Sequence, residues 1–326
     1  MNDMIFFTLI TNKYLAHAKL MINSFLKYNN GKFVIGLIDS LPDDLSIYDD
    51  IEVIPVESIG IAEFEEMTKK YSSIELLTAC KPFYFKFLMN LYPNSNSFIY
   101  LDADIKFYNS IMDILNNTRD YSVLLTPHFL SPQNDELNPS DHDILRNGIF
   151  NLGFICINRY KEAIEFNEWW CEKLVNYSFA DLSRGYFTDQ LWVNFAPAFL
   201  AKLKILRNIG LNVSNWNLHE RFIDIKNGSY LINGNENMIF YHFSNFKLER
   251  PDILAGYNNR FTFDNRPEMR LLFDEYIEEV LKFGYNKYKN IPWVYENKKR
   301  AKWIFIYKRV LMKIKKIIYV RLKLKF

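Results

Sequence analysis

The chain has 326 residues and a mass of 39.0 kDa; 49% of its residues are hydrophobic and 24% are charged, with 11 Gly and 11 Pro. This composition excludes disordered, collagen-like and low-complexity proteins, and the length allows one large α/β domain with a sizeable core. The three cysteines are an odd number without a Cys-x-x-Cys pair. They therefore indicate neither a disulfide framework nor a cysteine-based zinc site, and we expect a reducing compartment.

The net charge of +2 conceals two parts of opposite charge. The last thirty residues hold 12 of the 40 Lys and Arg residues and none of the 38 Asp and Glu residues. The acidic remainder argues against a nucleic-acid-binding protein, because affinity for phosphate backbones needs a basic face. We therefore expect no nucleic acid among the partners.

The N-terminus lacks the features of an export signal. Met-Asn-Asp-Met precedes the apolar run from Ile5 to Ile10, with no basic leader and no small-residue cleavage site. No segment reaches the roughly 18 uninterrupted apolar residues that a membrane-spanning helix needs. The sequence thus predicts a cytoplasmic protein without a membrane-spanning helix.

Strands and helices alternate along the first third of the chain. Hydrophobic spacing predicts strands over residues 4–10, 33–38, 51–56 and 97–101, and helices over 14–28, 61–71 and 82–91. This order predicts an α/β fold, a Rossmann-like and mostly parallel sheet with helices on both faces. Ligands in such a sheet collect at the carboxyl ends of the strands.

The later part of the chain is less regular. Residues 127–146 are polar and include Pro132 and Pro139, which predicts a long loop over a site. Strands are expected over 151–158 and 238–243, and helices over 163–177 and 189–200. Because there is no internal repeat and no Gly/Ser-rich linker, we expect one domain over residues 1–295 and a C-terminal tail over 296–326.

The sharpest feature is the pair Asp102 and Asp104, which follows the apolar run FIYL. In an extended chain, side chains two positions apart point to the same side, so the two carboxylates can converge. Their repulsion, a few kcal/mol at about 4 Å and an effective dielectric near 20, would be relieved by a divalent cation. Hard oxygen ligands suit Mg²⁺ or Mn²⁺. The alternative is a solvated turn with two surface aspartates.

These aspartates and several later stretches resemble a known family. FIYLDADIKF resembles the strand and DxD motif of GT-A glycosyltransferases. The later stretches that strengthen the resemblance are LTPHFLSP (125–132), ILRNGIFNLGFICI (144–157), WW (169–170), FTDQLWVNFAPAF (187–199), ILRNIGLNVSNWNLHER (205–221) and FYHFSNF (240–246). Together they cover about residues 5–251 and are similar to bacterial transferases of surface-polysaccharide synthesis and, more distantly, to glycogenin-like retaining transferases.

The resemblance implies a GT-A fold and roles for three kinds of residue. Asp102 and Asp104 would bind the metal that holds the diphosphate of a nucleotide-sugar donor, with a UDP-sugar favoured. His242 would be a third ligand, and its alternative is a satisfied core histidine. Asp189 would be the carboxylate near the anomeric carbon, and its alternative is a first-turn acid favoured by a helix dipole.

Further residues are expected to contact the donor. Lys81 precedes Pro82, and because proline suits the first turn of a helix, Lys81 would lie at a helix N-terminus and grip the diphosphate; the alternative is an exposed lysine. The resemblance adds Asn151, Gly153 and Gln190 as donor contacts, although Asn151 and Gly153 could be a strand entry with a close backbone contact. The residues expected where a nucleoside would lodge are Thr8, Asn12 and Asp39.

The tail has the pattern of a basic amphipathic helix. At about 100° per residue, one apolar stripe is formed by Trp303, Ile306, Tyr307, Val310, Leu311, Ile314, Ile317 and Ile318. Lysines and arginines occupy the opposite side, so we expect the tail to bind an anionic membrane surface. Packing of the stripe on the domain is the alternative.

These observations predict a metal-dependent glycosyltransferase that moves a sugar to a glycan or lipid-linked glycan acceptor at the cytoplasmic face of the membrane. Inversion and retention both stay open. One alternative is a nucleotidyltransferase, although residues 5–28 lack the Gly-rich phosphate loop of that class. The other is a catalytically silent carbohydrate-binding or membrane scaffold protein with the same fold.

Overall fold

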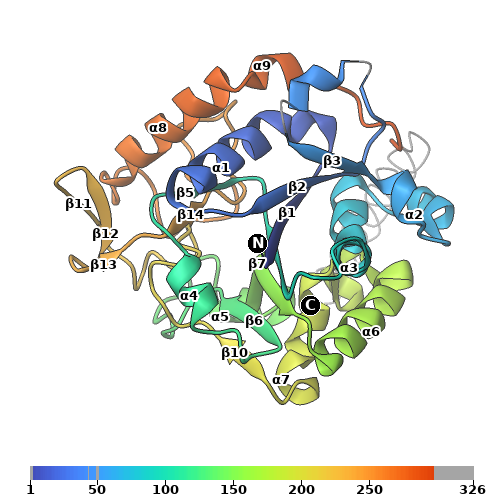
Figure 1. Ribbon diagram of the computed structural model, residues 1–326. Coiled ribbons are helices and arrows are strands. Elements are labelled where there is room, and N and C mark those ends of the chain that lie inside the picture. Colours follow the sequence, from blue (N-terminus) through green and yellow to red (C-terminus); the bar gives the residue numbers. More distant parts are fainter. Residues whose placement is uncertain (1–2, 43, 49–50, 297–326) are drawn as a thin grey trace, which may run out of the picture.

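The structure is a computed structural model that describes residues 3–42, 44–48 and 51–296, and the predicted amphipathic tail lies outside them. A seven-stranded sheet with the order β10-β6-β7-β4-β1-β2-β3 forms its centre (Figure 1). Its strands are β1 (Met4–Ile10), β2 (Lys32–Leu37), β3 (Glu52–Pro55), β4 (Ser97–Leu101), β6 (Val123–Pro127), β7 (Phe150–Asn158) and β10 (Leu203–Ile205). Only β7 runs antiparallel to its neighbours in this sheet. The predicted α/β class with a mostly parallel sheet is confirmed.

Helices cover both faces of this sheet, as its apolar strands require. Phe6 of β1 contacts Phe25 of α1 (Leu15–Tyr28), whereas the next residue, Phe7, contacts Phe85 of α3 (Ser73–Leu91) on the opposite face. The helices α8 (Met269–Lys282) and α9 (Tyr285–Tyr288) pack on α1, and α6 (Lys161–Tyr177) packs on α3 (Figure 1). The alternation of side chains along β1 thus divides the core into two layers.

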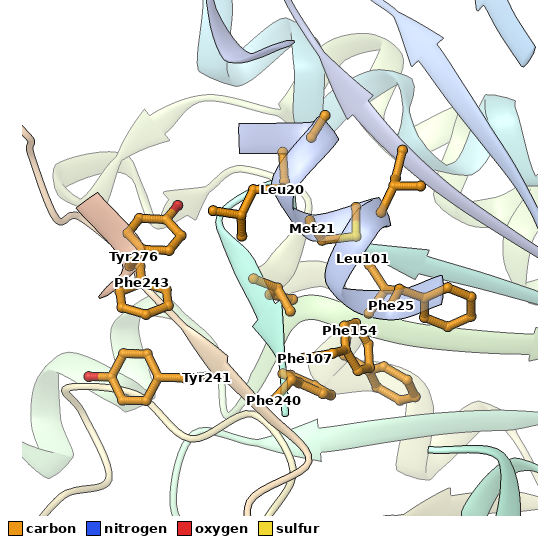
Figure 2. Close-up of a cluster of buried hydrophobic side chains, with 14 of the residues drawn as sticks. Leu20, Met21, Phe25, Leu101, Phe107, Phe154, Phe240, Tyr241, Phe243 and Tyr276 are labelled. Atoms are coloured by element: carbon orange, nitrogen blue, oxygen red, sulfur yellow. The ribbon is translucent and has the colours of Figure 1, made fainter. Parts of the chain in front are cut away.

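A separate antiparallel pair, β5 (Ile105–Phe107) and β14 (Phe240–His242), lies next to α1. Figure 2 shows the cluster that holds this pair, in which the Phe107 ring lies 5.3 Å from Phe25 and 5.2 Å from Phe240. The register sets His242 opposite Ile105, the residue that follows Asp104. Burial of these aromatic rings therefore fixes the backbone on which Asp104 and His242 stand.

The remaining elements are short and lie around the sheet. The helices among them are α2 (Phe64–Lys70), α4 (Met112–Asn116), α5 (Asp141–Asn147) and α7 (Ala196–Phe199), with the 3₁₀ helices η1 (Asn12–Tyr14), η2 (Leu45–Tyr48), η3 (Val56–Ile59), η4 (Leu182–Arg184) and η5 (Gln190–Phe195). The strands are β8 (Ala180–Asp181), β9 (Tyr186–Phe187), β11 (Ile223–Lys226), β12 (Ser229–Ile232) and β13 (Glu236–Asn237). In the part of the chain that the structure describes, none of the helices has both the length and the apolar character to traverse a bilayer.

Among the predicted boundaries that were wrong, two are explained by helix caps. The helix expected from Pro82 begins at Ser73, because Ser72 and Glu75 form a capping box. Burial of the α3 face outweighs the cost of an internal proline, about 3 kcal/mol. Lys81 therefore lies inside a helix rather than at its N-terminus. The loop expected over residues 127–146 ends in α5, which begins with a capping box between Ser140 and Asp143.

Candidate active site

Asp102 and Asp104 lie in the turn between β4 and β5, at the carboxyl end of a central strand. The Asp102 amide donates to the Gly153 carbonyl at 2.9 Å, and the Asp104 carbonyl accepts from the Phe243 amide at 2.8 Å. The two aspartates thus converge across a turn, and our expectation of an extended segment was wrong. The turn is fixed by backbone bonds to β7 and to the end of β14.

His242 completes a group of three potential metal ligands. Its Nε2 lies 3.0 Å from Asp104 Oδ1 and 3.6 Å from Asp102 Oδ2. One ligand atom from each of the three residues lies within 4.8 Å of the others. Two carboxylates and one imidazole are a suitable donor set for a divalent cation, and the short reach between them fits one ion.

Gly153 makes room for the imidazole ring. A Cβ atom at this position would lie 2.3 Å from His242 Cε1 and 2.6 Å from His242 Nδ1, far inside contact distance. Any larger residue would therefore displace the ring from its position beside the aspartates. The predicted donor contact Gly153 is placed beneath the candidate metal ligands, where its missing side chain gives His242 its position.

The charges of the three residues depend on one another. Removal from water raises the pKa of Asp102 more than Lys81 and His242 lower it. Removal from water also opposes ionisation of Asp104, but the neighbouring His242 outweighs it and holds the Asp104 pKa below its ordinary value. Burial alone would lower the His242 pKa, yet Asp104 raises it above the ordinary value. The group thus attracts positive charge, as a cation site requires.

Lys81 and Asp189 form a buried ion pair beside this group. Lys81 Nζ lies 2.6 Å from Asp189 Oδ2, with both side chains only 3% exposed, and donates to the Leu152 carbonyl at 3.0 Å. The Lys81 ammonium also lies 4.2 Å from the centre of the Tyr100 ring, whose hydroxyl donates to Asp102 Oδ1 at 2.6 Å. Tyr100 therefore connects the Lys81–Asp189 pair to the aspartates.

A cavity of about 630 Å³ lies beside these groups at the carboxyl end of the sheet, and neither Asp104 nor Tyr100 is among its lining residues. Its polar wall includes Lys81, Asp102, Asn151, Gly153, Asp189, Gln190 and His242. Most of the residues that we predicted for the site thus face one cavity. The apolar residues that also line it include Ile74, Ile144, Leu182 and Phe187. A cavity of this size is typical of small-molecule sites.

Two of the expected donor contacts have side-chain amides that bond within the protein. The Gln190 amide donates to the Asn147 carbonyl at 2.9 Å and accepts from the Leu152 amide at 3.2 Å. Asn151 Oδ1 accepts from the Gly153 amide at 3.0 Å. Both residues line the cavity, and their donor-binding roles stay predictions.

The three residues expected around the nucleoside are not among those that line the cavity. Thr8 is buried within β1 rather than after it. Asp39 accepts from the Asn12 amide at 3.1 Å and from the Val294 amide at 3.1 Å, so a late segment of the chain covers it. Their nucleoside role stays a prediction.

Sequence reasoning missed three residues of the site. Tyr100 orients Asp102, as described above. Asn212 is fully buried and bonds to His242 through its side-chain amide. Thr188 has a left-handed backbone with φ of 47°, unusual for a β-branched residue, directly before Asp189. No local pattern signals the roles of Asn212 and Thr188, because both depend on the tertiary structure.

Comparison with solved structures finds distant likenesses. The crystal structure of the galactosyltransferase LgtC in complex with donor and acceptor sugar analogues is 11% identical, with a TM-score of 0.47, over 88% of this chain and 97% of that one. Mouse xyloside xylosyltransferase 1 in its apo form is 14% identical, with a TM-score of 0.43, over 73% of this chain and 96% of that one.

Comparison with known sequences finds two proteins of Bacillus subtilis strain 168 and one family. YfnF is 24% identical over 204 residues, 61% of this chain and 65% of that protein, so the chain spans just under two thirds of its length. YfnD is 26% identical over 246 residues, 72% of this chain and 76% of that protein; both are described only as uncharacterized. The model of the family described as "Glycosyl transferase family 8" matches residues 5–181. Because this match covers more than half of the chain, the protein belongs to glycosyl transferase family 8 and is a glycosyltransferase.

Proposed function

We propose that this glycosyltransferase transfers a sugar from a nucleoside-diphosphate sugar, with a UDP-sugar favoured, in a reaction that requires Mn²⁺ or Mg²⁺. The acceptor in this proposal is a glycan or lipid-linked glycan of surface-polysaccharide synthesis. One observation carries the metal dependence: Asp102, Asp104 and His242 bring three ligand atoms within 4.8 Å of one another at the end of a central strand. The family membership supports a sugar-transfer reaction at the cavity beside them.

The chemistry follows from what the leaving group needs. A nucleoside diphosphate gains negative charge as its bond to the sugar breaks, and a cation bound to the three residues would supply the positive charge that stabilises it. The candidate ligands are preorganised, because the Tyr100 hydroxyl donates a hydrogen bond to Asp102 and Gly153 leaves room for the His242 ring. Preorganised groups of this kind lower the barrier because they need not rearrange during the reaction.

Asp189 is proposed to position substrate in the cavity. Its Oδ2 faces Lys81 at 2.6 Å, and its Oδ1 accepts from the Thr188 hydroxyl at 3.2 Å. Both carboxylate oxygens are thus engaged, which favours an orienting role over that of a base that removes the acceptor proton. We therefore expect retention at the anomeric carbon, and the NMR coupling constant of the product's anomeric proton tests this.

The membrane part of the proposal rests on the sequence pattern of the tail. The excess of 12 basic residues in the last thirty, with an apolar stripe, supports attachment to the anionic inner face of the cell membrane. Flotation of the full chain with vesicles of anionic lipid tests it, with a variant that lacks residues 301–326 for comparison. We expect the full chain to float and the shortened chain to sediment, and equal flotation would contradict the proposal.

Release of nucleoside diphosphate tests the proposed reaction. The protein is incubated with a panel of nucleotide-sugars without acceptor, with Mn²⁺ or with EDTA, and the products are separated by chromatography. We expect slow, Mn²⁺-dependent release of the nucleoside diphosphate from one donor, and its loss in Asp104→Asn. Formation of a nucleoside triphosphate and a sugar 1-phosphate when pyrophosphate is added to the same mixture would indicate a nucleotidyltransferase. Absence of any product would favour a silent carbohydrate-binding protein.

A further inference from the structure

Asn212 lies behind His242, on the side away from the aspartates. It is fully buried in the segment that backs β14, where the His242 amide donates to the Val213 carbonyl at 2.8 Å. Its φ of 51° is left-handed, a conformation that asparagine adopts more easily than most residues. Its own carbonyl accepts from the Asn217 side chain at 3.0 Å, which holds the backbone in place.

The side-chain amide of Asn212 has one possible orientation, and a backbone group determines it. The Gly153 N–H can only donate, so the oxygen that it meets at 3.0 Å must be Asn151 Oδ1 acting as acceptor. The Asn212 group that faces this oxygen at 3.0 Å must then be the donor Nδ2. Nδ2 also donates to Thr126 Oγ1 at 2.9 Å. The Asn212 oxygen is therefore left to face His242.

The other end of the network gives the same assignment. His128 Nδ1 lies 3.1 Å from the Ile149 carbonyl, which can only accept, so Nδ1 carries the proton of this ring. His128 Nε2 is then the acceptor for Asn151 Nδ2 at 3.4 Å. Asn151 thus donates to His128 and accepts from Asn212. The Gly153 N–H and the Ile149 carbonyl therefore determine the same donor and acceptor for each hydrogen bond of this network.

The orientation of the Asn212 amide determines which ring nitrogen of His242 carries the proton. Its Nδ1 lies 3.2 Å from Asn212 Oδ1, and because that oxygen only accepts, Nδ1 must carry the proton. In the neutral ring, the lone pair then lies on Nε2, the atom that faces Asp104 at 3.0 Å. We propose that Asn212, held by Asn151, is the positioning residue that fixes His242 in the Nδ1–H tautomer and turns Nε2 toward the cation site. This inference rests on the proposed metal site, although the tautomer itself does not.

The tautomer is measured directly by NMR of the full chain with ¹⁵N-labelled histidine. The ¹⁵N shift distinguishes a ring nitrogen that carries a proton from one that carries a lone pair, and His242→Gln assigns one of the five histidines. Spectra of the metal-free protein are read at the alkaline end of a pH series, where the ring is neutral. We expect a proton on Nδ1 and a lone pair on Nε2 in the wild-type chain. A proton on Nε2 would overturn the proposal without the need for any Asn212 variant.

Affinity for Mn²⁺ alone, measured by calorimetric titration, supplies the second readout. Asn212→Gly removes the amide but keeps a residue that tolerates the left-handed backbone. We expect Mn²⁺ affinity to fall by about 10- to 100-fold, as is typical when a partner of a ligating histidine is lost, and the His242 spectrum to show both tautomers. The matched control is Asn227→Gly, with φ of 52° in the turn between β11 and β12, which should bind Mn²⁺ like the wild type.

The outcomes separate the two proposals. If Asn212→Gly binds Mn²⁺ as tightly as the wild type and keeps a single His242 tautomer, Asn212 has no positioning role. If the wild-type chain shows the expected tautomer but binds no Mn²⁺, the metal dependence of the proposed function is wrong, whereas the hydrogen-bond assignment stands.

Discussion

Replacement of Gly153 with alanine should damage the cation site more than the fold. The new Cβ would lie 2.3 Å from His242 Cε1, about 1.1 Å short of ordinary van der Waals contact, and 2.9 Å from Asn151 Oδ1. The nearest atoms belong to a ring rather than to the end of a flexible chain, so the His242 ring must shift by about 1 Å from the place where its Nε2 meets Asp104. We expect Mn²⁺ affinity to fall by about 10- to 100-fold and the free energy of unfolding to fall by about 1–3 kcal/mol.

Gly36→Ala is the matched control for this prediction. Its Cβ would lie 2.3 Å from Leu9 Cδ2 and 2.5 Å from Tyr84 Cε1, a similar overlap inside β2 but without contact to His242. Urea denaturation should show a similar loss of stability in both variants, whereas calorimetry should show weak Mn²⁺ binding only in Gly153→Ala. Wild-type Mn²⁺ affinity in Gly153→Ala would refute our account of the glycine.

Three further predictions concern charge and backbone conformation. Lys81→Met should lower the free energy of unfolding by about 3–5 kcal/mol, because it leaves the buried Asp189 carboxylate without its partner. In urea denaturation, the double variant Lys81→Met/Asp189→Leu should recover most of this loss, and no recovery would contradict the pairing. Thr188→Asn should raise the free energy of unfolding by about 1 kcal/mol, because asparagine tolerates φ of 47° better than a β-branched residue. A free energy of unfolding below that of the wild type would contradict the claim that Thr188 is strained. Burial lowers the pKa of His17 from its ordinary value of 6.5 to about 4. Between these two pH values, His17 binds a proton in the unfolded chain but stays neutral in the folded chain. The free energy of unfolding therefore falls as the pH falls from 6.5 toward 4. Between pH 7 and pH 5, urea denaturation should show a decrease about 2 kcal/mol smaller in His17→Phe than in the wild type, and equal decreases would contradict it.

The sheet and one edge of the site could be predicted because their signals are local. Strands covered on both faces are continuous apolar runs, which is why β1 and β4 stand out in the sequence. The DxD pair follows β4 directly, so its place at the carboxyl end of a strand needed no tertiary information. The residues of the capping box, Ser72 and Glu75, are also visible in the sequence, but we placed the helix start at Pro82 because proline suits a first helical turn.

The rest of the site depends on contacts between distant parts of the chain. Asn212 meets Thr126 and Asn151, which are 86 and 61 positions away, and nothing in its own neighbourhood indicates either bond. The partner of Lys81 is equally remote in sequence, so its ion pair with Asp189 could not be expected from local pattern. Helix α8 packs on α1 from the far end of the chain, and we did not predict it.

The position of a bound Mn²⁺ tests the central proposal most directly. Crystals of the full chain are grown with Mn²⁺ and a nucleoside diphosphate, and the ion is located from its anomalous scattering. We expect one peak within coordination distance of Asp102, Asp104 and His242, with a diphosphate oxygen as a further ligand. A nucleoside diphosphate bound in the cavity with no Mn²⁺ peak at these three residues, or with the peak elsewhere, would contradict it.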